Sequence, residues 1–166
     1  MSTPRRVVTG HDAAGRSVVL SDGPTPRSYD IGVAVFHELW NTNATPAPVA
    51  ATEPEPTERA LVTPPAPNGT IIRITEIKAG QRSPMHRTES IDYGIVLEGE
   101  VWLVLDDGSQ TQLGPGDVVI QRGTDHAWEN RSAQSVRIVF VLVDGAYAEE
   151  LRQTLGSPAL YDHALD

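Results

Sequence analysis

From Thr70 onwards the chain alternates apolar and polar residues with a period of two, in short runs that are separated by turn residues. This alternation is typical of half-buried β-strands, and several short strands at such spacing predict a sandwich or a barrel. The expected strands are 70–78, 92–97, 100–105, 110–113, 117–122, 126–130 and 135–143. Asp-Asp-Gly-Ser at 106–109 and Gly-Pro-Gly-Asp at 114–117 are strong turn signals between them. The pattern therefore predicts an all-β fold.

The N-terminal part of the chain departs from this pattern. Short β-like pieces at 6–8 and 17–20 flank a glycine-containing turn and predict a hairpin arm. The mixed segment 31–40 favours a further strand, because it carries enough apolar surface to pack against another element.

The C-terminal part carries the one helical pattern. Residues 146–155 place Tyr147, Leu151 and Leu155 on one stripe, and Gly156 is the expected stop. We expect this short helix to cover an open end or an edge of the barrel.

Proline divides the arm from the barrel. Seven of the thirteen prolines lie between Pro46 and Pro67, where they exclude a helix or a central strand and favour an extended spacer on the surface. With 166 residues the chain fits one domain overall. Its expected parts are an N-terminal β arm (1–45), a Pro-rich extended connector (46–67), the barrel core (68–145) and a C-terminal helix with tail (146–166).

Composition narrows the choice of partners. The formal charge of −9 and the pI of about 4.9 disfavour nucleic acid and anionic membranes. The absence of cysteine leaves only His, Asp, Glu and water as metal ligands. The N-terminus has no apolar core of signal-peptide length and no run is long enough to span a membrane, so we expect a cytoplasmic protein.

Two stretches combine a histidine near a turn with a nearby carboxylate. In the first, Gly80 is followed by five residues and His86, and Asp92 and Gly99 come later in the same stretch. The second runs from Gly116 to Asn130 and contains His126. The glycines suit chain reversals between strands, so the two stretches are interpreted as two halves of one site.

The spacing of both stretches resembles the two motifs of the cupin superfamily, over roughly half the chain. Cupins are double-stranded β-helix barrels of the jelly-roll type, so the resemblance implies that fold. The cupin motifs carry three histidines and a glutamate. Here His86 and His126 match two of the histidines, whereas Thr88 takes the place of the third and Asp92 that of the glutamate.

The resemblance implies a divalent metal inside the barrel. His86, Asp92 and His126 have the composition of a two-histidine, one-carboxylate triad, which leaves open positions on iron(II) for substrate and oxygen. Fe(II), Mn, Ni and Zn are the candidate metals. The alternative is a metal-free pocket, in which Asp92 orients a histidine that acts as general acid or base.

Four further residues are expected to shape a substrate pocket: Thr88, Gln121, Trp128 and Gly94. Strand parity places Gly94 on the same inward face as Asp92, where its missing side chain would leave space for a ligand. His11 or His37, brought across by the arm, is a further candidate to complete the site.

These observations lead to two functional hypotheses. The first is a cupin-type enzyme that acts inside the barrel on a small oxygenated metabolite, by oxygenation, decarboxylation or isomerisation. The second is a non-catalytic small-molecule-binding or sensing cupin without metal. A homodimer is expected in both cases, because sheet edges tend to be covered and the arm suits crossing onto a neighbour.

Overall fold

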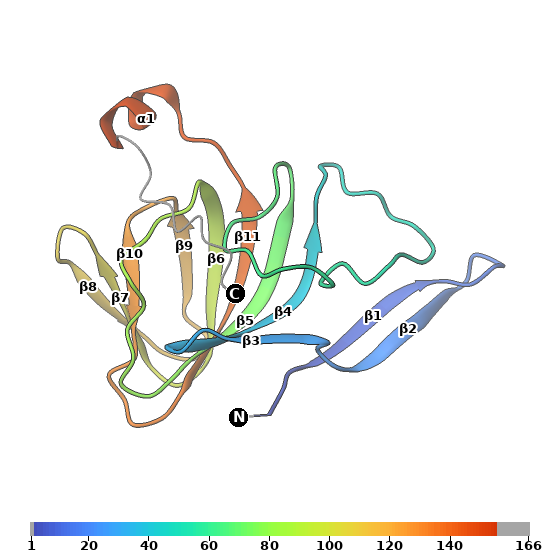
Figure 1. The fold of residues 1–166 in the computed structure, drawn as a ribbon, viewed down its shortest axis with the longest axis horizontal. Helices are drawn as coiled ribbons and strands as arrows, with labels where there is room; N and C mark the ends of the chain where they lie inside the picture. Colours follow the sequence, from blue (N-terminus) through green and yellow to red (C-terminus); the bar gives the residue numbers. More distant parts are fainter. Residues whose placement is uncertain (1, 156–166) are drawn as a thin grey trace.

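The computed structural model describes residues 2–155, and all of its long elements in that range are β-strands (Figure 1). The strands are β1 (Arg5–His11), β2 (Ser17–Pro24), β3 (Arg27–Asp30), β4 (Ala34–Thr42), β5 (Thr70–Ile77), β6 (Ser90–Glu98), β7 (Val101–Leu105), β8 (Gln110–Leu113), β9 (Val118–Arg122), β10 (His126–Glu129) and β11 (Val136–Asp144). One short helix, α1 (Glu149–Leu155), follows them. The all-β prediction and the seven strands expected after residue 68 are confirmed.

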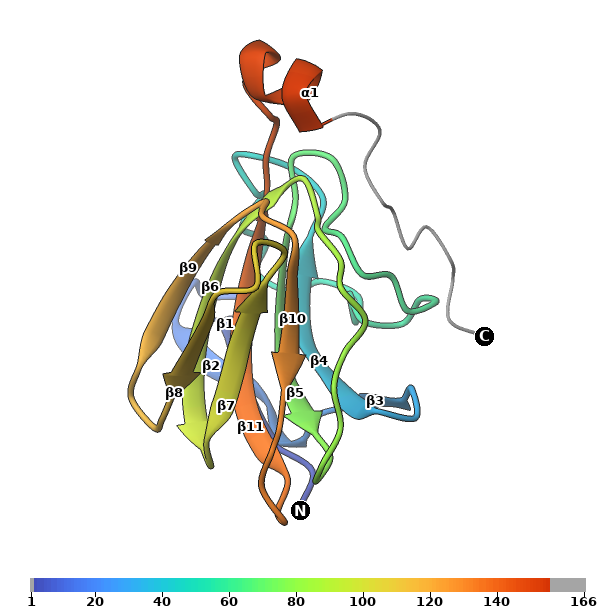
Figure 2. The same cartoon turned by 90° about the vertical axis from the view of Figure 1, so that its left-hand side faces the viewer.

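Two sheets face each other and enclose the core. The larger has the order β3-β4-β5-β11-β6-β9, and the smaller has the order β10-β7-β8. Figure 2 shows β7, β8 and β10 in front of β6 and β11. This is the expected jelly-roll arrangement.

Strand parity places side chains in the core as the alternation predicts. On β6, Asp92, Gly94 and Val96 are buried, whereas Tyr93 and Leu97 are exposed. The central cluster joins apolar residues of both sheets, namely Ala34, Ile77, Val96, Val101, Leu113, Trp128, Val136 and Ile138. Burial of these side chains away from water is the main force that holds the two sheets together.

The N-terminal segment has two parts. The hairpin β1–β2 projects away from the barrel (Figure 1). By contrast, β4 pairs along β5 and β3 pairs with β4, so both belong to the larger sheet. The strand expected at 31–40 thus exists, and it is an integral part of the barrel.

The connector packs against the barrel and is not a loose spacer. The side chains of Thr57 and Leu61 are only 1% and 2% exposed. Glu55 forms an ion pair of 2.6 Å with Arg6. Burial of this kind fixes the path of the chain between β4 and β5, despite its many prolines.

The helix α1 is shorter than predicted and buries none of its residues. Leu151 is exposed, and Tyr147 precedes the helix instead of lying on it. The expected apolar stripe is therefore corrected: Leu151 is not part of it, whereas Tyr147 is half-buried and its hydroxyl donates to the carbonyl of Gly123 at 2.7 Å. The expected stop at Gly156 and the tail to residue 166 lie outside the described residues. None of the helices described is of a length and hydropathy that would cross a membrane.

Candidate functional site

A cavity of about 310 Å³ lies inside the barrel. Most of its wall is apolar, and includes Phe36 from β4, Trp128 from β10 and Phe140 from β11. Four ionisable side chains also line it, namely Arg73, His86, Asp92 and His126. A concave apolar pocket with a few convergent polar groups is the usual form of a small-molecule site.

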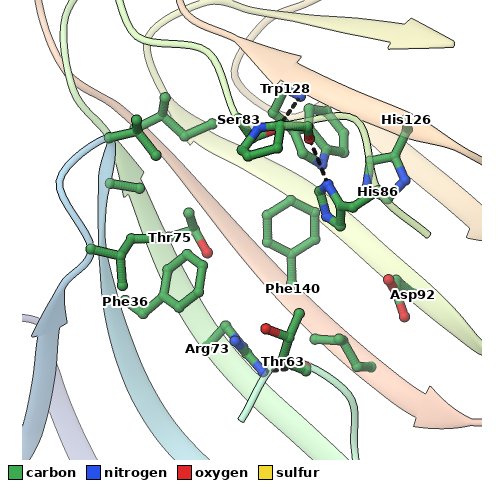
Figure 3. Close-up of a pocket in the computed structure, with 16 residues that line it drawn as sticks. Phe36, Thr63, Arg73, Thr75, Ser83, His86, Asp92, His126, Trp128 and Phe140 are labelled. Atoms are coloured by element: carbon green, nitrogen blue, oxygen red, sulfur yellow. Dashed lines mark hydrogen bonds between the residues drawn. The ribbon is translucent and has the colours of Figure 1, made fainter. Parts of the chain in front are cut away.

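The backbone brings two of these groups together. His86 and His126 form a β-bridge, in which the amide of each donates to the carbonyl of the other at 2.9 Å. Residues directly opposite in such a bridge place their side chains on the same face. The two ring centroids are 4.3 Å apart, and Figure 3 shows both rings beside Trp128 and Phe140.

Hydrogen bonds to the backbone fix the tautomer of both imidazoles. Nδ1–H of His86 donates to the carbonyl of Pro84, and Nδ1–H of His126 donates to the carbonyl of Thr124, each at 2.9 Å. Because a carbonyl can only accept, Nδ1 carries the proton and Nε2 keeps its lone pair. Both residues therefore offer a basic nitrogen.

His126 is held in its neutral form. Burial lowers its pKa to about 4, and the neighbouring His86 acts in the same direction. A second positive charge this close would be unfavourable in a pocket of low polarity. At neutral pH His126 is thus an uncharged proton acceptor.

Asp92 lines the same cavity from β6, at the end of a chain of hydroxyl groups. Oγ of Ser90 donates to its Oδ1 at 2.7 Å, and Oγ1 of Thr88 lies 2.7 Å from Oγ of Ser90. Burial raises the pKa of Asp92 to about 6, whereas the Ser90 hydrogen bond and the charge of Arg73 act against that rise. The carboxyl group is therefore close to half-protonated at mildly acidic pH.

The donor set does not fit the metal site expected from the resemblance. Among residues 2–155 no group of three or more His, Cys, Asp or Glu side chains is arranged to hold a metal ion. His86 and His126 have the right tautomer for ligation, but Asp92 does not join them in such a group. Two imidazoles alone fall short of the three protein ligands that catalytic metal sites commonly use.

The residues predicted to bind substrate divide into two groups. Trp128 lines the cavity, and its ring centroid lies 5.3 Å from that of Phe140. Thr88 and Gln121 are buried but do not belong to the cavity lining. The space beside Gly94 is filled by Phe140, because a Cβ at Gly94 would lie 2.9 Å from Cε1 of that ring. The glycine thus makes room for an aromatic side chain of the protein itself.

Neither arm histidine reaches the cavity of its own chain. His37 is buried, with Nδ1 2.7 Å from Oγ of Ser28 and Nε2 4.0 Å from a carboxylate oxygen of Glu76. His11 is an exposed residue at the end of β1. Both lie outside the cavity lining.

Sequence reasoning did not select several lining residues. Phe36, Thr63, Phe140 and Arg73 come from three strands and the connector. Period-two alternation places Arg73 on one face with Ile71 and leaves open whether that face is inside. The structure settles it, because Ile71, Arg73 and Thr75 are buried on the inner face of β5, which lies between β4 and β11.

Comparison with known proteins agrees with this geometry. A family model described as a cupin domain matches residues 73–142. The chain is 41% identical to phomopsin biosynthesis cluster protein C' of Diaporthe leptostromiformis, over 94% of this chain and 86% of that protein. It is 37% identical to the cupin-domain-containing oxidoreductase fogC of Aspergillus ruber, over 84% of this chain and 71% of that protein.

Among solved structures, the Cnp3 cupin domain of Schizosaccharomyces pombe has a TM-score of 0.54 and 14% identity, over 94% of this chain and 98% of that one. At this identity the likeness concerns the fold alone. Fold and cavity define a small jelly-roll barrel with an internal pocket. The chain belongs to the cupin superfamily.

Proposed function

We propose that the protein is an enzyme that isomerises a small, largely apolar, oxygenated metabolite inside the barrel, and that His86 and His126 move the proton. The observation that carries this proposal is the imidazole pair in an apolar cavity, with each Nδ1–H bound to a backbone carbonyl. Nε2 of each ring thereby keeps a free lone pair and can accept a proton.

The proposed step uses groups of this chain alone. Nε2 of His126 takes a proton from a substrate carbon next to a carbonyl group, and the electron pair of the broken C–H bond moves into an enolate. Where that carbon also lies next to a C=C double bond the enolate is a dienolate, and the imidazolium returns the proton at its γ-carbon, so the double bond moves into conjugation and atoms and charge balance. Asp92 in its protonated form would stabilise the enolate oxygen, because its raised pKa keeps a proton available below about pH 6.

The relatives support an enzyme in general terms. Four are named cupin-domain-containing oxidoreductases, and others are named after biosynthesis clusters. A cavity with mainly apolar walls suits such small metabolites.

The proposal is tested by proton exchange in D₂O. A panel of small aryl ketones is incubated with the protein, and deuterium uptake next to the carbonyl is followed by ¹H NMR. We expect catalysed exchange that falls about 10²- to 10⁴-fold in His126→Gln, since positioned general bases contribute this much. His11→Gln, an exposed histidine outside the cavity, is the matched control. If the two variants exchange equally, His126 is not the base.

A metal-dependent oxidoreductase is the second candidate, and it is favoured by the names of the relatives and by the two available Nε2 atoms. Metal analysis of the purified protein, followed by iron(II) titration of wild type and His126→Ala, decides between the two candidates. Stoichiometric binding that is lost in His126→Ala would support this candidate. A third outcome, ligand binding without turnover on the whole panel, would support a non-catalytic binding protein.

A further inference from the structure

Arg73 is the one lysine or arginine among the residues that line the cavity. It lies on β5, is 3% exposed, and its guanidinium carbon is 5.1 Å from the ring centroid of Phe36. Figure 3 shows it on the opposite side of Phe140 from the two histidines. A permanent charge at this depth is costly unless something compensates it.

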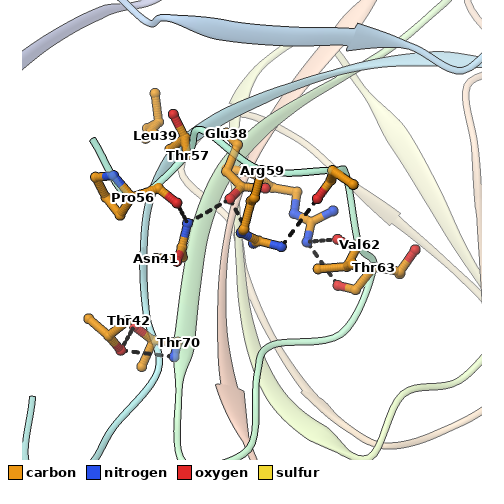
Figure 4. Close-up of polar contacts among 12 residues, drawn as sticks. Glu38, Leu39, Asn41, Thr42, Pro56, Thr57, Arg59, Val62, Thr63 and Thr70 are labelled. Carbon is orange, nitrogen blue, oxygen red and sulfur yellow. Dashed lines mark hydrogen bonds and ion pairs between the residues drawn. The ribbon is translucent and has the colours of Figure 1, made fainter. Parts of the chain in front are cut away.

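The compensation that the protein supplies is incomplete. Nη2 of Arg73 donates to the carbonyl oxygens of Val62 and Thr63, at 3.1 and 2.8 Å. Figure 4 shows these two connector residues side by side. Both acceptors are neutral. Nε of Arg73 is buried and has no hydrogen-bond partner within the described part of the chain. The guanidinium group thus lacks a carboxylate of its own.

The nearby carboxylates are engaged elsewhere. Oε1 of Glu38 accepts from Nη2 of Arg59 at 2.7 Å and from Nδ2 of Asn41 at 2.9 Å. Asp92 accepts from Ser90. Burial lowers the pKa of Arg73 to about 10, so the group is still charged at neutral pH. The connector carbonyls thus bind the guanidinium group, and Glu38 lies nearby with its own partners, but neither neutralises the charge of Arg73.

We propose that the ligand of this cavity carries one carboxylate on an otherwise apolar body, and that Arg73 is the residue that binds this carboxylate. This inference deepens the proposed function and rests on it in one respect, namely that the end of the ligand near His86 and His126 is the one that reacts. A carboxylate at Arg73 places the apolar body along Phe36 and Phe140 and directs the other end of the ligand towards His86 and His126. A single guanidinium group favours a monoanion over a dianionic phosphate.

The proposal is tested with two probes of nearly equal shape, 4-phenylbutanoate and 4-phenylbutanamide, by isothermal titration calorimetry. Wild type is expected to bind the acid about tenfold or more tightly than the amide, since hydrogen bonds to charged groups carry this selectivity. In Arg73→Gln the two affinities become equal, while the amide binds as in wild type. Arg122→Gln, an exposed arginine on β9, removes the same charge outside the cavity and keeps the preference.

A second measurement does not depend on the folding of a variant. In ¹⁵N-labelled wild type, the acid shifts the Nε–H signal of Arg73 at saturation and the amide leaves it in place. Failure of the acid to bind, equal affinities in wild type, a preference that survives Arg73→Gln, or an unmoved Nε–H signal would each overturn the proposal.

Binding and turnover separate this proposal from the function above. His126→Gln is expected to keep the preference for the acid although it loses proton exchange. Proton exchange that depends on His126, without any preference for the acid, would refute only the proposal that Arg73 binds a carboxylate. A preference for the acid that depends on Arg73, without exchange in any substrate, would refute the proton-transfer function alone.

Discussion

Burial moves the pKa values of His126 and Asp92 in opposite directions within one cavity. The pKa of the His126 imidazole falls to about 4 and that of the Asp92 carboxyl rises to about 6, so the usual order of the two pKa values is reversed. Between these values both groups are uncharged, which is the form that burial favours. A base and an acid of this kind are available at the same pH.

We expect Asp92→Asn to change stability in a pH-dependent manner. Folded Asp92 keeps its proton up to about pH 6 and unfolded Asp92 only to about 3.8, so wild type loses stability as pH rises between these values. The free energy of unfolding of Asp92→Asn, taken relative to wild type, is expected to be about 2–3 kcal/mol higher at pH 8 than at pH 4. Urea unfolding at both pH values measures the difference.

The reciprocal variant has the opposite sign. The pKa of His126 is about 4 in the folded protein and about 6.5 in the unfolded chain. Wild type therefore loses stability as pH falls from 6.5 to 4, because only the unfolded chain binds a proton in this range. The free energy of unfolding of His126→Gln, taken relative to wild type, is therefore expected to be higher at pH 4 than at pH 7. A pH-independent difference for both variants would contradict the burial argument.

At the level of elements, the connector does more than join two strands. It buries Leu61 and offers the carbonyls of Val62 and Thr63 to Arg73, so a segment outside the two sheets forms part of the cavity wall. Its prolines reduce the entropy of the unfolded chain and so lower the cost of ordering it.

We expect Leu61→Ala to destabilise the protein by about 2–4 kcal/mol, the usual cost of removing a buried leucine side chain. Val49→Ala in the same connector is the control, because Val49 is 89% exposed and its loss should cost little. Urea unfolding of both variants provides the comparison. Equal and small effects would mean that the connector does not pack against the barrel in solution.

Local signals explain which elements were predictable from the sequence. Period-two alternation and the turn at 106–109 located the strands after residue 68, and parity on β6 correctly placed Asp92 inside. The same reasoning could not show that Phe140 fills the space beside Gly94, because that contact joins residues on two different strands. The predicted apolar stripe on the helix was wrong, because Leu151 does not pack against the barrel and is exposed.

The candidate site was predictable to a similar degree. Motif spacing selected His86 and His126, which the β-bridge does bring together. It did not reveal the backbone hydrogen bonds that set their tautomer, nor the position of Asp92 outside a metal-holding group. Alternation alone does not decide which face of β5 carries Arg73, because its burial depends on the sheet order and on the connector.

At the scale of the whole molecule, the homodimer expected from the sequence stays a prediction. The outer face of β6 and β9 exposes four large apolar side chains, namely Tyr93, Leu97, Val118 and Ile120. Tyr93 and Ile120 are paired in register, so they lie side by side on this face. A second copy of the chain is the occupant that we expect to cover it.

Light scattering after size exclusion tests this expectation. Wild type should have twice the chain mass of 17.9 kDa, and the double variant Val118→Lys/Ile120→Lys should have the single mass. Thr111→Lys, on the exposed part of β8, serves as the control for added charge. A monomeric wild type, or a dimer that survives the double substitution, would count against this interface.

The imidazole pair in the cavity is proposed to transfer protons without a metal ion. The most direct test is the exchange rate of one aryl ketone in D₂O, measured on the same preparation before and after exhaustive chelation, with His126→Gln alongside. We expect a rate that chelation leaves unchanged and that His126→Gln lowers about 10²-fold or more. A rate that disappears on chelation and returns with iron(II), or one that is indifferent to His126, would contradict it.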